Sequence, residues 1–227
     1  MADKKKTQTK ADRPGLIRRN YIFEIRAEES DQGNVITGRP IVYNSRTDLG
    51  WFDEIIEPGA LNSTDLTDVR FLVNHDLSKI PLARSRRNNG NSTMQLTVDN
   101  DGLSIRVQLD IENNADARAL YSAVQRGDIT GMSFMFGISD EEWEALDSEH
   151  PTRRVRGIST VVEVSAVTFP AYEATEINAR DRTALENARS ALESARQSRG
   201  KSVDTDIELM KERNKRIWIE LNQEVKA

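Results

Sequence analysis

Cysteine is absent from this 227-residue chain, and histidine occurs only twice. Without cysteine the chain can form no disulfide, thiol nucleophile or thiolate metal site. No apolar run approaches the roughly 20 residues that span a bilayer, and no apolar segment follows the N-terminal charges as in a signal peptide. The formal net charge of −5 gives no overall positive field that would favour nucleic acid. We therefore expect a soluble, non-secreted protein without membrane contact.

The chain length suits one domain of moderate size with tails. Residues 1–20 are rich in lysine and arginine and predict a flexible basic tail. Residues 21–180 carry the strand-like patterns and predict the main domain. Residues 181–227 contain one glycine and no proline, and their apolar residues recur at spacings of three and four. This spacing predicts a helical extension.

Turn and capping signals place several elements of the main domain. The tripeptide Asn100-Asp101-Gly102 predicts a hairpin between strands at residues 93–99 and 103–110, because Asp-Gly tolerates the positive φ of a tight turn. A helix is expected to start at Asn113 or Asn114 as its N-cap and to end at Arg126, with Gly127 as the stop signal.

A strand bracketed by glycines, residues 131–137, presents a serine. With a period of two, its larger apolar residues share one face, namely Met132, Phe134 and Phe136. Ser133 and Met135 then lie on the other face. One face would anchor the strand, and the other would present the hydroxyl of Ser133.

A carboxylate lies near the end of another expected strand-like segment, residues 153–170. Counting by two places four residues on one face, namely Val161, Glu163, Ser165 and Val167. Val162, Val164 and Ala166 are expected on the opposite face. An ionised carboxylate in such an apolar strand is costly unless it has a partner.

The two histidines lie in different surroundings. His150 follows the acidic segment 140–149, expected as an exposed loop or short helix, and is interpreted as a solvated loop residue. His75 is expected to end an apolar strand, on the same face as Phe71 and Val73, and is the candidate base for an activated serine. No metal or cofactor is predicted, because cysteine and any phosphate-cradling glycine loop are absent.

His75, Ser133 and Glu163 follow one another in the order base, nucleophile, acid. A serine hydroxyl becomes a good nucleophile when an imidazole takes its proton, and a carboxylate improves the imidazole by orienting it and stabilising its charged form. Two alternatives exist for the third member. Asp76 is adjacent to His75, and Ser165 shares the expected strand face of Glu163.

Five short motifs follow one another between residues 38 and 171. They are Gly38-Arg39-Pro40-Ile41-Val42-Tyr43-Asn44, Glu57-Pro58-Gly59-Ala60, Asn74-His75-Asp76, Gly131-Met132-Ser133-Phe134 and Glu163-Val164-Ser165-Ala166-Val167-Thr168-Phe169-Pro170-Ala171. Together they resemble the HK97-type prohead maturation proteases of tailed bacteriophages. The resemblance covers about residues 21–180, and Leu61 stands where that family usually has an aromatic residue.

The resemblance implies an α+β, mainly β fold: a small antiparallel β-barrel surrounded by a few helices, related to the herpesvirus assemblins, with a helical C-terminal extension. It implies a serine endopeptidase with Ser133 as nucleophile, His75 as general base and Glu163 orienting the base. Expected partners are the major capsid protein, its scaffold segment and the protease itself, and the expected location is the interior of the procapsid in the host bacterial cytoplasm. A homo-oligomer is expected, and residues 181–227 would be a targeting or self-cleaved segment.

Two other functions fit some of the residues. A non-catalytic capsid-assembly scaffold would use the barrel as a platform and the helical extension for binding, and it would cause no Ser133-dependent shortening of the capsid protein. A nucleic-acid-binding module would use the basic tail with Arg84, Arg86 and Arg87, but the negative net charge disfavours it.

Overall fold

The computed structural model describes residues 16–21, 25–30, 33–168, 181–197 and 210. The chain divides into two compact units, residues 1–180 and 181–227. Several sequence predictions fall outside the described residues: the basic tail up to residue 15, the end of the last motif at residues 169–171 and, apart from residue 210, the helical extension beyond residue 197.

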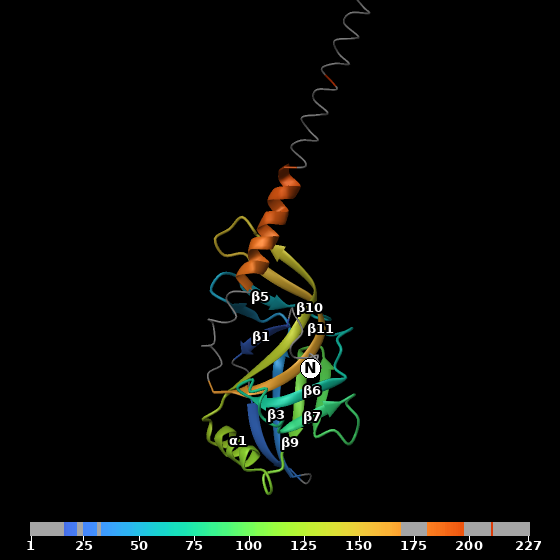
Figure 1. Ribbon diagram of the computed structural model, residues 1–227, viewed down its shortest axis with the longest axis vertical. Helices are drawn as coiled ribbons and strands as arrows, with labels where there is room; N and C mark the ends of the chain where they lie inside the picture. The colour runs from blue at the N-terminus through green and yellow to red at the C-terminus, as the bar shows by residue number, and fades with distance from the viewer. Residues whose placement is uncertain (1–15, 22–24, 31–32, 169–180, 198–209, 211–227) are drawn as a thin grey trace, which may run out of the picture. The chain divides into compact units, whose positions relative to one another are not determined.

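The strands of the first unit form two sheets (Figure 1). The seven-stranded sheet has the order β1-β10-β11-β5-β4, with β6 paired to β11 and β7 to β6, and the four-stranded sheet has the order β2-β3-β9-β8. The strands are β1 (Leu16–Tyr21), β2 (Ile25–Ser30), β3 (Gly33–Val42), β4 (Arg46–Asp48), β5 (Asp53–Ile56), β6 (Asp68–Val73), β7 (Ala83–Arg86), β8 (Met94–Asp99), β9 (Gly102–Gln108), β10 (Gly131–Glu144) and β11 (Thr152–Val167).

The predicted mainly β class with helices is confirmed, but the described strands form two separate sheets rather than one closed antiparallel barrel. The larger sheet is also mixed. β11 is 16 residues long, and it pairs in parallel with β5 at residues 152–155 and with β6 at residues 163–166. Its antiparallel partner is β10, so β11 is the strand on which the other elements of this sheet are assembled.

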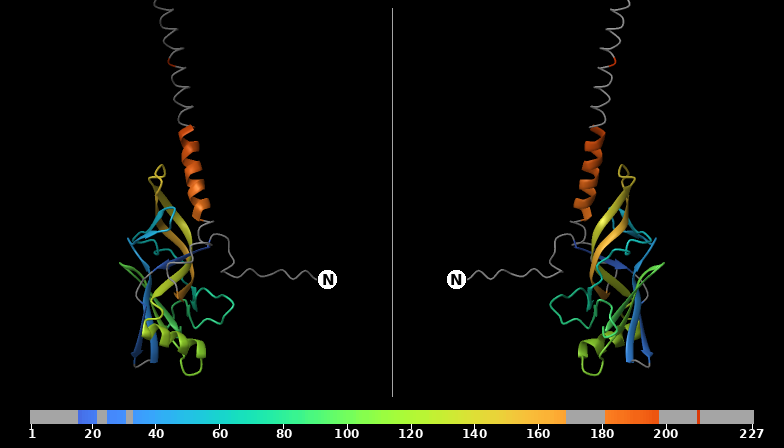
Figure 2. Two further views of the ribbon diagram at one scale, coloured as in Figure 1. Left: turned by 90° about the vertical axis from the view of Figure 1, so that its left-hand side faces the viewer. Right: turned by 90° about the vertical axis from the view of Figure 1, so that its right-hand side faces the viewer.

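Local signals placed the hairpin and the helix correctly. β8 and β9 form the predicted antiparallel hairpin. Helix α1 (Ala115–Arg126) begins after Asn114, whose side chain accepts hydrogen bonds from the main-chain N–H groups of Asp116 and Ala117, and it ends at Gly127 with φ 78°. The helix contacts β2 of the four-stranded sheet, and Figure 2 shows it near one end of that sheet.

The apolar faces of the two sheets share one core. Ile36 and Val107 from the smaller sheet join Phe71, Phe134 and Val164 from the larger sheet in a single buried cluster. The other face of the larger sheet carries a small cluster, formed by Leu16, Met135 and Val162. The predicted alternation along β10 is therefore confirmed, since Met132, Phe134 and Phe136 all lie in the main core.

The predicted faces of β11 are wrong at Val161 and Val162. Val161 lies in the main core and Val162 in the small cluster, the reverse of the predicted assignment. The register with β10 shifts between Met135 and Phe136, where a β-bulge lets the strand change face. A bulge of this kind depends on the partner strand, so period-two counting within β11 could not reveal it.

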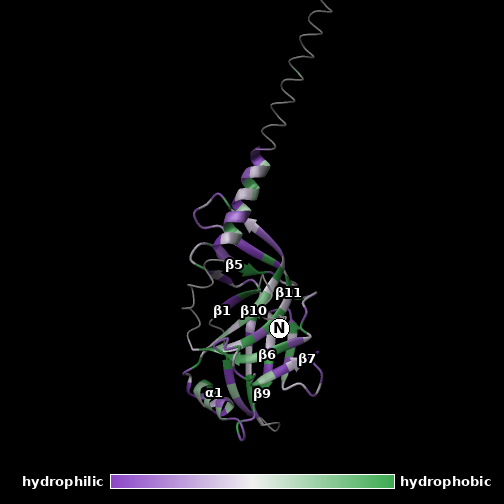
Figure 3. Cartoon of the chain, in the orientation of Figure 1, coloured by the Kyte–Doolittle hydropathy of each residue, from purple (hydrophilic) through white to green (hydrophobic). Residues whose placement is uncertain are grey.

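The acidic segment, residues 140–149, was predicted to be an exposed loop or a short helix, and this prediction is wrong for its first half. Residues 140–144 continue β10 to its end and pair with β11. Their charges are matched across the hairpin by Glu141 with Arg153, Glu144 with Arg154, and both Asp140 and Glu142 with Arg156. This outer part of the hairpin is largely purple in Figure 3, because charged residues that pair across it make up most of its length.

Residues 16–20, which the composition placed in the basic tail, form most of β1 at the edge of the larger sheet. In the second unit, residues 181–197 are helical, in the region where apolar spacing predicted a helix. Within the described parts of the chain, no helix is both long enough and apolar enough to cross a bilayer.

Replacing Gly102 with alanine should destabilise the first unit by about 2 kcal/mol or more. Gly102 has φ 138°, and an added Cβ would lie 2.0 Å from the carbonyl oxygen of Ile41. Urea unfolding would measure the loss. Gly90→Ala is the control, because its added Cβ meets no atom within 4 Å, and unfolding at the same urea concentration for both variants would contradict the prediction.

Candidate active site

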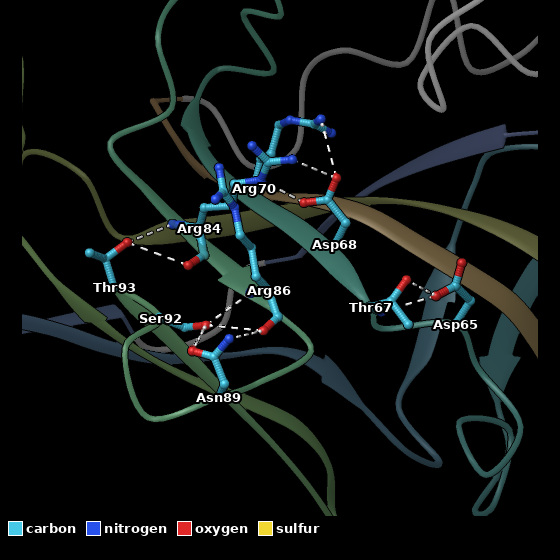
Figure 4. Close-up of polar contacts among 9 residues, drawn as sticks. All are labelled: Asp65, Thr67, Asp68, Arg70, Arg84, Arg86, Asn89, Ser92 and Thr93. Carbon is cyan, nitrogen blue, oxygen red and sulfur yellow. Dashed lines mark hydrogen bonds and ion pairs between the residues drawn. The ribbon is translucent and has the colours of Figure 1, made fainter.

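His75 lies in the connection between β6 and β7, which pair as a hairpin. The two strands pair antiparallel from Asp68 opposite Arg86 to Phe71 opposite Ala83. The Asp68 carboxylate accepts hydrogen bonds from Arg84 Nε at 2.6 Å and Arg84 Nη2 at 2.8 Å (Figure 4). This bidentate ion pair links β6 to β7 on the side away from the core. On its other edge, β6 pairs in parallel with β11.

His75 lies on a turn and not on the strand that the sequence predicted. β6 ends at Val73, and both Asn74 and His75 have left-handed backbone conformations, with φ 50° and 57°. Asn74 fastens the turn to the end of β11. Its main-chain N–H donates to the Ala166 carbonyl at 3.0 Å, and its side-chain oxygen accepts from the Thr168 N–H at 2.9 Å. Non-glycine residues adopt this conformation only where surrounding contacts hold them.

The turn brings His75 against Glu163 on β11. The distance between His75 Nδ1 and Glu163 Oε1 is 2.5 Å, and the two side chains are 1% and 0% exposed. Burial of a carboxylate is unfavourable without hydrogen bonds, and the imidazole supplies one of them. Glu163 therefore has the partner that its place in an apolar strand required.

Ser165 contacts both of these residues. Its hydroxyl donates to Glu163 Oε2 at 2.6 Å and accepts the main-chain N–H of His75 at 3.1 Å. Asp76, the other alternative for the third member, contacts Ser78 instead. Its carboxylate accepts hydrogen bonds from the hydroxyl and the N–H of Ser78, which together hold the pKa of Asp76 below its usual value.

Ser133 lies on the same face of the sheet. It is directly opposite Ser165 in the antiparallel register of β10 and β11, and Met135 is likewise opposite Glu163. Side chains at directly opposite positions have Cβ atoms about 5 Å apart. Ser133 is fully buried, and its hydroxyl donates at 2.8 Å to the carbonyl oxygen of Arg19 in β1.

Arg19 is a neighbour of Ser133 that the sequence did not reveal. Its guanidinium donates to both oxygens of Glu54 on β5, at 2.5 Å and 2.8 Å, and the two side chains are 1% and 0% exposed. Arg153 extends the buried network, with Nη1 3.6 Å from Glu54 Oε2 and Nε 2.7 Å from Glu141 Oε2. The apolar residues Leu16 and Ile17 beside this basic stretch were the available signal that the strand pattern starts before residue 21.

His150 belongs to a different, exposed group. Its Nε2 lies 3.1 Å from Asp53 Oδ1, and Asp48 completes the one cluster of possible metal ligands among the described residues. Burial raises the pKa of Asp53, but hydrogen bonds from Arg46 and His150 outweigh it and leave the pKa lowered. The Arg46 guanidinium, 2.5 Å from Asp53, already supplies positive charge there.

Comparison with known proteins gives one strong similarity. The sequence profile of a family described as caudovirus prohead serine protease matches residues 22–190, more than half of the chain. A solved structure of the bacteriophage T4 capsid assembly protease aligns with a TM-score of 0.43 and 12% sequence identity, covering 69% of this chain and 98% of that one. None of the curated proteins matches the chain.

Proposed function

Because this chain belongs to the caudovirus prohead serine protease family, we propose that it cleaves capsid and scaffold segments with Ser133, His75 and Glu163 as its catalytic triad. Family membership makes the chain a serine protease and favours hydrolysis over the non-catalytic scaffold. The observation that supports the triad most strongly is the buried contact of 2.5 Å between His75 Nδ1 and Glu163 Oε1, on the sheet face that also carries Ser133.

In this assignment each residue has a separate role. Ser133 Oγ attacks the carbonyl carbon of the scissile bond while His75 takes its proton through Nε2, and His75 then gives that proton to the leaving amine. Water hydrolyses the resulting acyl-enzyme by the same proton transfers in reverse. Glu163 accepts the hydrogen bond from Nδ1–H, which fixes the tautomer and stabilises the charged imidazole.

The described conformation is a resting one in this proposal. Ser133 is fully buried, and its hydroxyl donates a hydrogen bond to the Arg19 carbonyl. The hydroxyl has to turn from Arg19 toward His75, and a substrate needs access that the buried serine does not offer. β1 is an edge strand paired only with β10 in its sheet, so we expect its movement to open the site.

The partners follow from the proposed role. The substrates are the major capsid protein with its scaffold segment and the protease itself, and the reaction takes place inside the assembling procapsid in the host bacterial cytoplasm. The protease acts as a homo-oligomer. Residues 181–227 form a unit that targets the protease to the shell or is removed by self-cleavage.

Mass spectrometry after co-expression with the capsid protein of the same phage tests this function. The wild-type protein should shorten the capsid protein, and its fragments should identify the cut sites. Ser133→Ala protein should leave both itself and the capsid protein at full length. Normal processing by the Ser133→Ala variant would refute the assignment of the nucleophile, and an unprocessed capsid protein with the wild type would refute the proposed substrate.

A further inference from the structure

Ser165 joins two parts of the site that come from different strands. Glu163 and Ser165 are two residues apart on β11, whereas His75 follows β6. The hydroxyl of Ser165 has one proton and accepts through its lone pairs, and the structure uses both capacities. The hydroxyl donates a hydrogen bond to Glu163 Oε2 at 2.6 Å, and its oxygen accepts one from the main-chain N–H of His75 at 3.1 Å.

The geometry points to Ser165 as a positioning residue for the His75–Glu163 pair, an inference that rests on the proposed protease function. A carboxylate side chain can rotate about its last bond. The Ser165 hydroxyl holds Oε2, which leaves Oε1 directed at His75 Nδ1. The same hydroxyl holds the backbone of His75, so the acid and the base are positioned from one atom.

The backbone contact matters because His75 has a left-handed conformation, with φ 57°. The main-chain N–H of a buried residue needs an acceptor, and Ser165 Oγ is that acceptor. Without the hydroxyl, the turn would lose a contact that holds its unusual conformation, and the imidazole ring would lose its fixed direction.

Loss of the Ser165 hydroxyl should reduce catalysis more than folding. For Ser165→Ala we expect kcat to fall roughly 100-fold, the effect of displacing a catalytic group by about 1 Å, with KM little changed. Ser85→Ala is the matched control. Ser85 is also a fully buried serine of the larger sheet, but its hydroxyl has no hydrogen-bond partner among the described residues. Its removal should leave kcat at the wild-type value.

A second measurement does not depend on protease activity. A short hydrogen bond between Nδ1–H and a carboxylate gives a proton resonance far downfield in the NMR spectrum of the full-length protein, and its loss in His75→Asn would assign it. We expect Ser165→Ala to remove or shift this resonance and Ser85→Ala to leave it unchanged. If the Ser165→Ala protein does not fold, Ser165→Cys fills the site with a weak donor and should show the same changes.

The two measurements separate the two proposals. If Ser165→Ala alters the resonance but the wild-type protein cleaves nothing, the proposed function is refuted and the role of Ser165 in holding the pair is supported. A wild-type resonance together with wild-type kcat in the Ser165 variants would refute the positioning role and leave the protease function intact.

Discussion

Replacing Ser133 with alanine should lower the rate of peptide-bond cleavage by roughly 10⁴- to 10⁶-fold and leave the fold intact. The substitution removes the proposed nucleophile, the hydroxyl oxygen that would attack the scissile carbonyl. Its structural cost is small, because within the described part of the chain the hydroxyl makes one hydrogen bond, to the Arg19 carbonyl, worth about 1 kcal/mol. The measurement is kcat/KM on a peptide that spans a mapped cut site.

The double variant with His75→Asn tests whether these residues act as one unit. Asparagine tolerates the left-handed backbone that His75 adopts, so the turn should persist. Residues of one catalytic unit have strongly non-additive effects, and the double variant should therefore be about as slow as Ser133→Ala alone. Rate losses that multiply in the double variant would show that His75 and Ser133 act independently. Ser85→Ala again serves as the control for removing a buried serine hydroxyl.

The parts of the fold that the sequence predicted depend on short-range chemistry. Asn114 and Gly127 bound α1 through contacts within a few residues, and Asp101-Gly102 sets a hairpin turn. The bulge that exchanges Val161 and Val162 depends instead on pairing with β10, and the inclusion of Leu16–Tyr21 in the sheet depends on the same strand. Pairing between distant segments leaves little trace in the local pattern of either one.

In the candidate site, too, some features could be predicted from the local sequence and others depend on pairing between distant segments. The carboxylate of Glu163 in an apolar strand required a buried partner, and His75 is the residue that meets it. The serine of β10 was likewise visible from its alternation. The double contact of Ser165 could not be predicted, because it depends on a turn in which Asn74 and His75 both have positive φ. The Arg19 contact with Ser133 depends on the edge strand β1.

Breaking the buried ion pair between Arg19 and Glu54 should have the largest effect on stability. Removing one member of a buried pair leaves an uncompensated charge and costs about 3–5 kcal/mol. Glu54→Gln should show this loss in urea unfolding, since the pair is 1% and 0% exposed. Glu144→Gln is the matched control, because it makes the same change in an ion pair that is 30% and 48% exposed and worth about 0.2–1 kcal/mol.

The same variant tests whether this pair holds β1 over Ser133. Arg19 binds Glu54 through its side chain and Ser133 through its carbonyl oxygen, so loss of the first contact should loosen the second. Amide hydrogen exchange in residues 16–21 should become faster in Glu54→Gln than in Glu144→Gln. An apolar replacement of both partners, Arg19→Met with Glu54→Leu, should recover part of the stability, because it removes both charges of this pair and Arg153 keeps its contact with Glu141. Equal exchange in the two glutamine variants would mean that main-chain pairing with β10 alone keeps Ser133 covered.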